Sequence, residues 1–171
     1  VPHSVLWLLS TNKWAEENLK LNFLKNGLNP ARLYFADRIP VSNHLKRIQL
    51  ADLFLDTFNY NAHTTASDIL WSGIPIVTKI GHQFAARVTA SLLNAIDMPE
   101  LITTTPSEYE NLIIELASNP DTFRKLKAKL QKNRLSTPLF DTKRYTKNFE
   151  QGLKYAHQLK LKNLEFKDIW V

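Results

Sequence analysis

Short apolar runs alternate with segments of helical periodicity along most of the chain. The runs have the length of strands and lie at residues 4–9, 32–35, 53–55, 74–78 and 101–103. In the segment after the first run, Ala15, Leu19 and Phe23 fall on one face of a helix. Strands that alternate with helices in this way predict a parallel sheet covered by helices on both faces, an α/β fold of the Rossmann-like kind.

Capping residues and helix breakers indicate where the helices begin and end. Gly27 is the predicted stop of the first helix, and Ser42 is the predicted N-cap of the second. Thr105 and Glu108 stand three residues apart and have the form of a capping box. We expect helices over residues 14–26, 42–50, 64–71, 84–96 and 106–117, and two more that begin near 120 and 142.

The composition narrows the class of protein. A chain of 171 residues, 44% hydrophobic and 22% charged, fits one globular domain. No apolar run approaches the roughly 20 residues of a membrane span, and the first residues lack the layout of a signal peptide, so we expect a cytoplasmic protein. The chain has no cysteine, which excludes disulfides, thiolate metal sites and a cysteine nucleophile. The only methionine is Met98, so we take the chain to be a piece of a longer protein.

The formal charge of +6 brings nucleic-acid binding into consideration. Most of the excess positive charge lies on one predicted helix, at Arg124, Lys125, Lys127, Lys129, Lys132 and Arg134. Because no aromatic residues interleave with these cations and no known binding motif is present, we interpret the row as a solvated helix face. We therefore expect neither nucleic acid nor a membrane among the partners.

Residues 56–75 carry the clearest candidate chemistry. The first turn of a helix at the carboxyl edge of a sheet has unpaired N–H groups and a partial positive charge, so it can hold a phosphate. Thr64 and Thr65 add two hydroxyl donors at such a helix start, and His63 just before it offers a third. Asp68 lies one turn along on the same face, where a carboxylate can accept hydrogen bonds from ribose hydroxyls.

A local role for the same residues stays open at this point. Threonine at a helix start is often only a cap, and aspartate in the first turns often only balances the helix dipole. The chain has four glycines and no Gly-x-Gly-x-x-Gly pattern, which disfavours an NAD-type loop. No short His-x-His or His-x-x-x-His spacing indicates a metal site.

The run NAHTTASDILWSGIPIVT at residues 61–78 resembles the carboxyl-terminal half of the catalytic region of O-GlcNAc transferase and its bacterial relatives. Residues 49–52 and 55–57 before the run, and 86–88 and 91–93 after it, share the likeness. The likeness extends collinearly from residues 5–9 to residues 136–140, and weakly beyond. It therefore covers most of the chain.

The resemblance implies roles for individual residues. It implies that His63, Thr64 and Thr65 bind the pyrophosphate of a sugar donor, and that Asp68 binds its ribose. In the family, a histidine and an arginine on the preceding short helix lie near the nucleotide base, and His44 and Arg47 match them.

The backbone just ahead of that short helix, at Ile39, would contact the base. Two residues later the animal enzyme has a lysine where this sequence has Val41. The likeness therefore leaves one charged contact to the nucleotide without a counterpart.

The likeness also implies an architecture and a reaction. We expect the C-terminal lobe of a GT-B glycosyltransferase, with a nucleotide-sugar-binding lobe at 1–140 and a bracing C-terminal helix and tail at 141–171. The expected reaction is inverting transfer of N-acetylglucosamine or a related sugar from a UDP donor to a protein hydroxyl, with no metal cofactor. The acceptor site and acceptor-activating residues would belong to a missing N-terminal lobe and TPR repeats, so we expect the isolated chain to be inactive. The alternatives are a non-catalytic interaction lobe or a lobe of a nucleotide-sugar epimerase.

Overall fold

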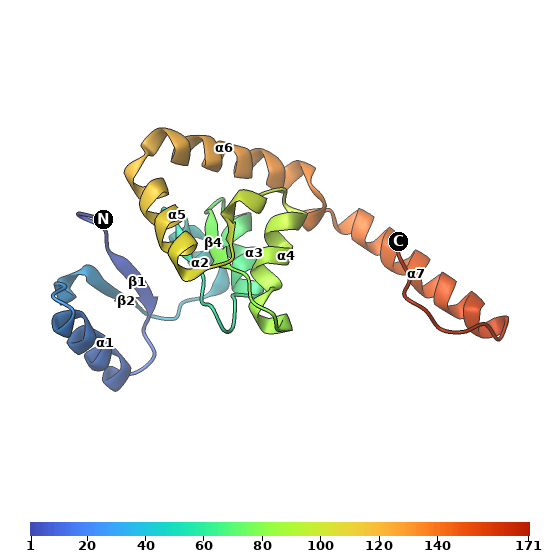
Figure 1. The fold of residues 1–171 in the computed structure, drawn as a ribbon, viewed down its shortest axis with the longest axis horizontal. Coiled ribbons are helices and arrows are strands. Elements are labelled where there is room, and N and C mark those ends of the chain that lie inside the picture. The colour runs from blue at the N-terminus through green and yellow to red at the C-terminus, as the bar shows by residue number, and fades with distance from the viewer.

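The computed structural model describes all residues, 1–171. The first unit of the chain consists of two parallel strands and one helix and lies to one side of the molecule (Figure 1). Leu6 pairs with Leu33 and Leu9 with Ala36. The helix buries none of its residues, and Trp14 is 77% exposed. This unit comprises β1 (Leu6–Leu9), α1 (Lys13–Lys25), a short 3₁₀ helix (Pro30–Arg32) and β2 (Leu33–Ala36).

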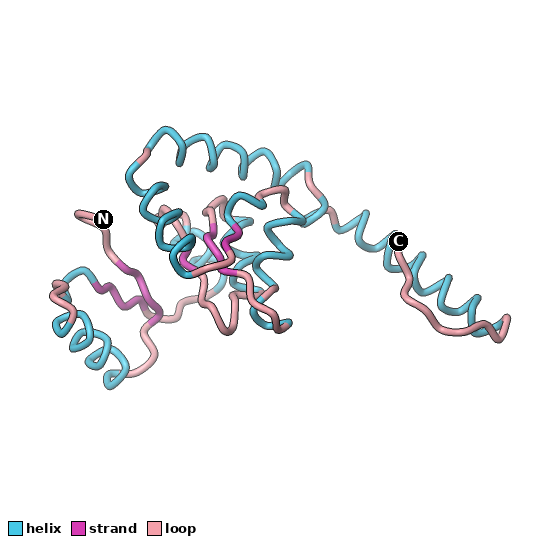
Figure 2. Tube along the Cα trace, in the orientation of Figure 1, coloured by secondary structure: helices cyan, strands magenta, loops and turns pink.

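The central unit holds three more parallel strands, with β4 in the middle. Phe54 pairs with Ile76, and Thr78 pairs with Ile102. In Figure 2 these short strands lie among the helices of the central unit, apart from β1 and β2. The elements are α2 (Val41–Ile48), β3 (Phe54–Leu55), α3 (Thr64–Trp71), β4 (Ile76–Lys79), α4 (Val88–Ala95) and β5 (Ile102–Thr103), with 3₁₀ turns at Phe84–Ala86 and Pro99–Leu101.

The α/β class and the parallel strands are confirmed, and each strand lies within two residues of its predicted bounds. Two helix predictions were wrong. Ser42 is not the N-cap of α2 but its second residue, because the Pro40 carbonyl already accepts the first helical hydrogen bonds, and the helix ends at Ile48 instead of Leu50. The segment predicted as one helix over 84–96 is a 3₁₀ turn followed by α4, because the Ala85 and Ala86 carbonyls accept from Asn61 and Gly81 outside the segment.

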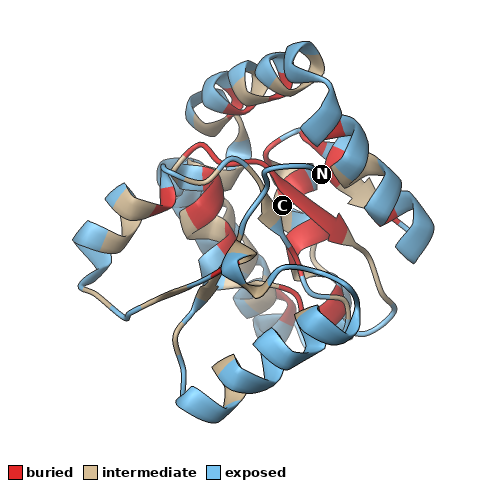
Figure 3. Cartoon of the chain, turned by 90° about the vertical axis from the view of Figure 1, so that its left-hand side faces the viewer, coloured by how far each residue is buried: buried red, intermediate tan, exposed pale blue.

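The hydrophobic core fills the space between β4 and the helices that cover it. Fifteen buried residues form one cluster, and Leu70, Ile76 and Leu93 in it are fully buried. Figure 3 shows the buried residues gathered at the centre, with exposed helix faces outside. Since burying one such side chain stabilises a fold by about 1.5–3 kcal/mol, this cluster fixes the position of α3 against the sheet.

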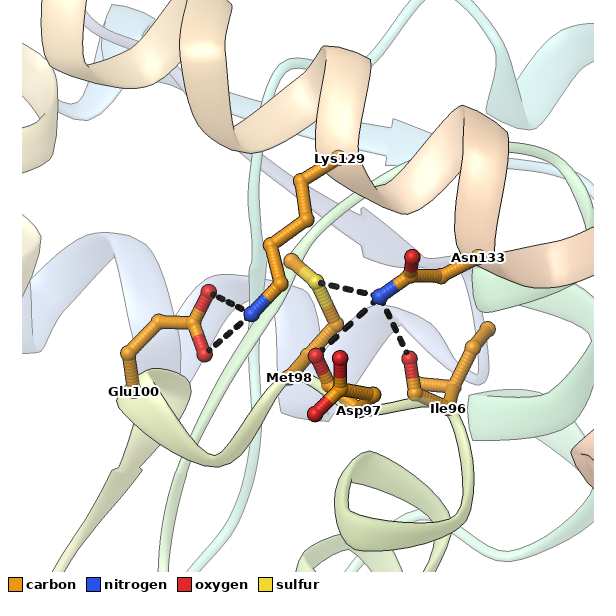
Figure 4. Close-up of polar contacts among 6 residues, drawn as sticks. All are labelled: Ile96, Asp97, Met98, Glu100, Lys129 and Asn133. Atoms are coloured by element: carbon orange, nitrogen blue, oxygen red, sulfur yellow. Dashed lines mark hydrogen bonds and ion pairs between the residues drawn. The ribbon is translucent and has the colours of Figure 1, made fainter. Parts of the chain in front are cut away.

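Two helices close the central unit. In α5 (Pro106–Ser118) the predicted capping box of Thr105 and Glu108 is present. From α6 (Pro120–Ser136), the Asn133 side-chain amide donates to the Ile96 carbonyl at 3.0 Å and to the Asp97 carbonyl at 3.1 Å, beyond the end of α4 (Figure 4). The same figure shows Lys129 paired with Glu100 at 2.8 Å. These contacts attach α6 to the turn that leads into β5.

The last helix, α7 (Thr142–Leu161), projects away from the central unit (Figure 1). Its N-cap is Asp141, as predicted. The tail returns along the helix, where the Leu164 amide donates to the Leu159 carbonyl at 3.0 Å. The division of the chain at residue 140 stays a prediction. None of the helices combines the length and the apolar character that crossing a membrane requires.

Candidate functional site

The start of α3 lies at the carboxyl end of β3, after a loop of residues 56–63. Four other helices, α1, α5, α6 and α7, have a side chain that accepts from a first-turn amide. His63 at the N-cap of α3 makes no such hydrogen bond. The first amides of α3 are therefore without a side-chain acceptor, which is the arrangement that an anion can complete.

An open pocket of about 430 Å³ lies at this helix start. Thr64 and Thr65 are exposed on its wall, and His63 stands beside them. The structure thus brings together three of the predicted site residues. The full lining is Phe54, Leu55, Asp56, Thr57, Tyr60, Asn61, Ala62, His63, Thr64 and Thr65.

The His63 ring is held between two aromatic side chains. It stacks on Tyr60 with ring centroids 4.8 Å apart, and it meets Phe84 edge-on at 5.9 Å. Its Nε2 atom is buried and has no hydrogen-bond partner. Aromatic contacts therefore fix the orientation of the ring, while one buried ring nitrogen lacks a polar partner. Tyr60 and Phe84 were not predicted from the sequence, since nothing in their spacing points to His63.

Asp68 lies one turn into α3 and is half-buried. Its carboxylate takes part in neither of the two ion pairs of the chain, which join Arg124 to Asp121 and Lys129 to Glu100. Asp68 is not among the residues that line the pocket. The structure therefore places Asp68 on the predicted helix without joining it to the pocket of Thr64 and Thr65.

The second predicted group lies on α2, which packs beside α3. Arg47 Nη2 is 3.3 Å from His44 Nδ1, so the two side chains are in contact as their spacing predicted. Arg47 Nη1 also donates to the Asp37 carbonyl at 2.9 Å, and the guanidinium lies 5.4 Å from the ring centroid of Trp7. Arg47 thus connects α2 to the first unit. Ile39 precedes α2 and is half-buried, and the pocket at Thr64 includes neither it nor His44 and Arg47.

Asp56 is one of two buried polar residues that line the pocket, and it is only 4% exposed. Its Oδ1 atom accepts from the amides of Thr57 at 2.9 Å and Ala62 at 2.7 Å, and Oδ2 accepts from the Thr78 hydroxyl at 2.6 Å. The Tyr109 hydroxyl donates to the Asp56 carbonyl at 2.9 Å. Burial, reinforced by the nearby Asp56 carboxylate, raises the pKa of Tyr109 to about 12. The signal in the sequence was an acidic residue directly after a short apolar run at residues 53–55.

Comparison with known proteins gives this geometry a context. The family model of glycosyl transferase family 41 matches residues 1–149. The chain belongs to glycosyl transferase family 41. Two of its relatives are UDP-N-acetylglucosamine--peptide N-acetylglucosaminyltransferases. The one from Caenorhabditis elegans is 39% identical over 90% of this chain, and the probable one from Arabidopsis thaliana is 38% identical over 89%.

A solved structure supports the same assignment. A mutant of the O-GlcNAc transferase of Thermobaculum terrenum superposes with a TM-score of 0.83 and 27% identity over 90% of this family 41 chain. The match covers 30% of that solved chain, and the chain spans 13% and 16% of the Caenorhabditis and Arabidopsis relatives. The resemblance to the catalytic region of O-GlcNAc transferases is therefore confirmed, as is the structural match to a GT-B catalytic domain.

Proposed function

We propose that the chain is the donor-binding half of an inverting protein O-glycosyltransferase that uses UDP-N-acetylglucosamine or a related nucleotide sugar. Membership of family 41 supports the reaction class. The single observation that carries the site is the start of α3, which has no side-chain cap and faces an open pocket with two exposed hydroxyls. Such a helix start suits a diphosphate.

The pyrophosphate would lie at Thr64 and Thr65. Both residues line the pocket, their amides and hydroxyls would donate to the phosphates, and the positive end of the α3 dipole favours negative charge there. In glycosyl transfer, negative charge develops on the departing diphosphate, so donors fixed in advance at this position stabilise the leaving group. His63 adds a third polar group beside them. On this account no metal cofactor is needed.

The nucleoside would extend from the pocket toward α2. Asp68 would accept hydrogen bonds from the ribose hydroxyls, and His44, Arg47 and the backbone at Ile39 would lie near the base. The packing of α2 beside α3 supports this direction. Val41, which is 68% exposed next to Pro40, supplies no charge to the nucleotide.

The protein acceptor and the residues that activate it would belong to a second lobe and to TPR repeats outside this chain. The chain spans only 13% and 16% of the Caenorhabditis and Arabidopsis relatives, which supports placing these residues in other parts of the protein. The isolated chain would therefore bind donor nucleotide weakly and transfer nothing. A cytoplasmic location also stays a prediction.

Calorimetric titration of the chain with UDP, uridine and inorganic pyrophosphate tests the proposal. We expect UDP to bind more tightly than either fragment, because it occupies both ends of the site. Sugar transfer by the isolated chain, or equal affinity for uridine and UDP, would contradict the proposed division between anion and base contacts.

The alternative of an interaction lobe rests on the cationic face of α6. Three of its cations already have partners within the chain, which weakens this alternative. Arg124 pairs with Asp121, Lys129 with Glu100, and Arg134 donates to the Trp71 carbonyl at 2.6 Å. Absence of any UDP binding, together with capture of an acidic peptide on α6, would favour the interaction lobe. An epimerase lobe has no such supporting observation.

A further inference from the structure

We infer that Asp56 is a positioning residue for the donor pocket, because its buried carboxylate joins both ends of the loop that enters α3 to the middle strand of the sheet. The inference rests on the proposed function. It concerns a residue that lies under the pocket and is expected to act through the loop rather than by holding the donor.

Two backbone amides donate to Asp56 Oδ1. Thr57 lies near the start of the loop and Ala62 near its end, yet both donate to the same oxygen, at 2.9 Å and 2.7 Å. A single atom therefore fixes the span of the loop. Because Ala62 precedes His63, the position of this oxygen sets where the backbone enters α3.

The Asp56 carboxylate is also attached to the sheet. Oδ2 accepts from the Thr78 hydroxyl on β4 at 2.6 Å, and the Thr78 carbonyl in turn accepts from the Thr103 hydroxyl on β5 at 2.9 Å. The Tyr109 hydroxyl of α5 holds the Asp56 carbonyl at 2.9 Å. We call the bonds from Asp56 to Thr57, Ala62, Thr78 and Tyr109 the Asp56 network.

Further contacts fix the same loop from its other side. The Thr89 hydroxyl of α4 donates to the Ala62 carbonyl at 2.8 Å, and the Asn61 amide donates to the Ala85 carbonyl at 2.8 Å. Asn61 is fully buried. A loop of eight residues with so many buried polar contacts has a defined shape. Removing the Asp56 carboxylate would leave two partly buried amides without acceptors and free the loop to rearrange.

The test compares Asp56→Ala with Asp56→Asn and with a remote control, Asn133→Ala. The asparagine variant can keep its oxygen toward the two amides while its NH₂ group donates to the Thr78 hydroxyl. Asn133 is as buried as Asp56, at 7% exposed, but binds the end of α4 and lines no part of the pocket. The control therefore destabilises the fold without touching the loop.

The readouts are the amide hydrogen exchange of Ala62 and the affinity for UDP, corrected for the folded fraction. We expect Asp56→Ala to lose protection at Ala62 and to bind UDP at least about tenfold more weakly, while Asp56→Asn stays within about threefold of the wild type. Asn133→Ala should bind UDP like the wild type. If Asp56→Ala does not fold, Thr78→Val removes one bond of the network and should weaken UDP binding by about threefold.

The outcomes separate this inference from the proposed function. If the wild type does not bind UDP, the proposed function fails, and hydrogen exchange at Ala62 still tests the network. If the wild type binds UDP but folded Asp56→Ala, or Thr78→Val in its place, binds equally well, the positioning role is overturned. Equal weakening by Asn133→Ala would overturn it too, since the effect would then reflect general stability.

Discussion

The two ends of the proposed donor site are built in different ways. The anion end at Thr64 stands on a loop whose backbone is fixed by the buried Asp56 network. The base end on α2 has no side-chain cap, and Arg47 holds it to the first unit through one hydrogen bond to Asp37 and a contact with Trp7.

The difference indicates which part of the site is preorganised. Donors that stabilise developing charge are most effective when they do not have to move, and the anion end meets that condition. Fewer contacts fix the base end, because Arg47 attaches it through one backbone hydrogen bond and one cation–π contact with the half-buried Trp7 ring. We therefore expect substitutions at the anion end to have larger effects on donor binding than substitutions at the base end.

The largest effect is expected from Thr64→Val combined with Thr65→Val. Each hydroxyl that donates to a charged phosphate contributes about 1.5–3 kcal/mol, so loss of both should lower the affinity for UDP by about 100-fold or more, to the limit of detection. Calorimetry measures the change. Thr142→Val is the matched control, since Thr142 also opens a helix but one that Asp141 caps. Unchanged UDP binding by the double variant would contradict the proposal that Thr64 and Thr65 bind the diphosphate.

Asp68→Ala should have an intermediate effect that depends on the sugar of the nucleotide. If the carboxylate accepts from a ribose hydroxyl, the wild type should prefer UDP to 2′-deoxy-UDP by about tenfold, and the variant should lose that preference. Competition titrations with the two nucleotides give the ratio. A variant that keeps the full preference would show that Asp68 does not contact the ribose.

Arg47→Ala tests the base end, and its effect on UDP affinity should be about threefold or less, in line with the loss of one cation–π contact. The substitution also removes the bond to Asp37, so backbone resonances of β1 should shift even without nucleotide. Arg47→Lys keeps the charge but not the planar contact with Trp7, and serves as the comparison. A loss of affinity as large as that of the threonine pair would break the contrast between the two ends.

The smallest effect concerns Tyr109, whose hydroxyl belongs to the Asp56 network. Tyr109→Phe should lower the free energy of unfolding by about 1 kcal/mol below pH 10. Because the pKa of Tyr109 is raised from 10.0 to about 12 on folding, the wild type binds this proton more tightly when folded, and its advantage should shrink as the pH rises from 10 to 12. Urea unfolding at several pH values measures the difference. An advantage that stays constant over this range would contradict the burial of the hydroxyl.

Local patterns in the sequence predicted those features that depend on neighbouring residues. The capping box at Thr105 and the cap at Asp141 form their hydrogen bonds within one helical turn, and the strands coincide with short apolar runs. The helix start at Thr64 was also a local prediction. The sequence did not show that this helix start has no side-chain cap and adjoins an open pocket.

Features that depend on distant contacts were not predictable in this way. Arg47 contacts Trp7, forty positions away in the sequence. Asp56 forms hydrogen bonds with Thr78 on β4 and Tyr109 on α5. The break before α4 arises because carbonyls of that segment bind Asn61 and Gly81 instead of continuing the helix. In this last case tertiary hydrogen bonds override the local helical period.

The start of α3 is the proposed binding site for the diphosphate of a nucleotide donor. The most direct measurement is a ¹⁵N–¹H correlation spectrum of the chain during titration with UDP. We predict that the largest amide shifts occur at Thr64 and Thr65, with smaller shifts on α2 and none on the cationic face of α6. Shifts confined to α6, or a spectrum that UDP does not change, would contradict the claim.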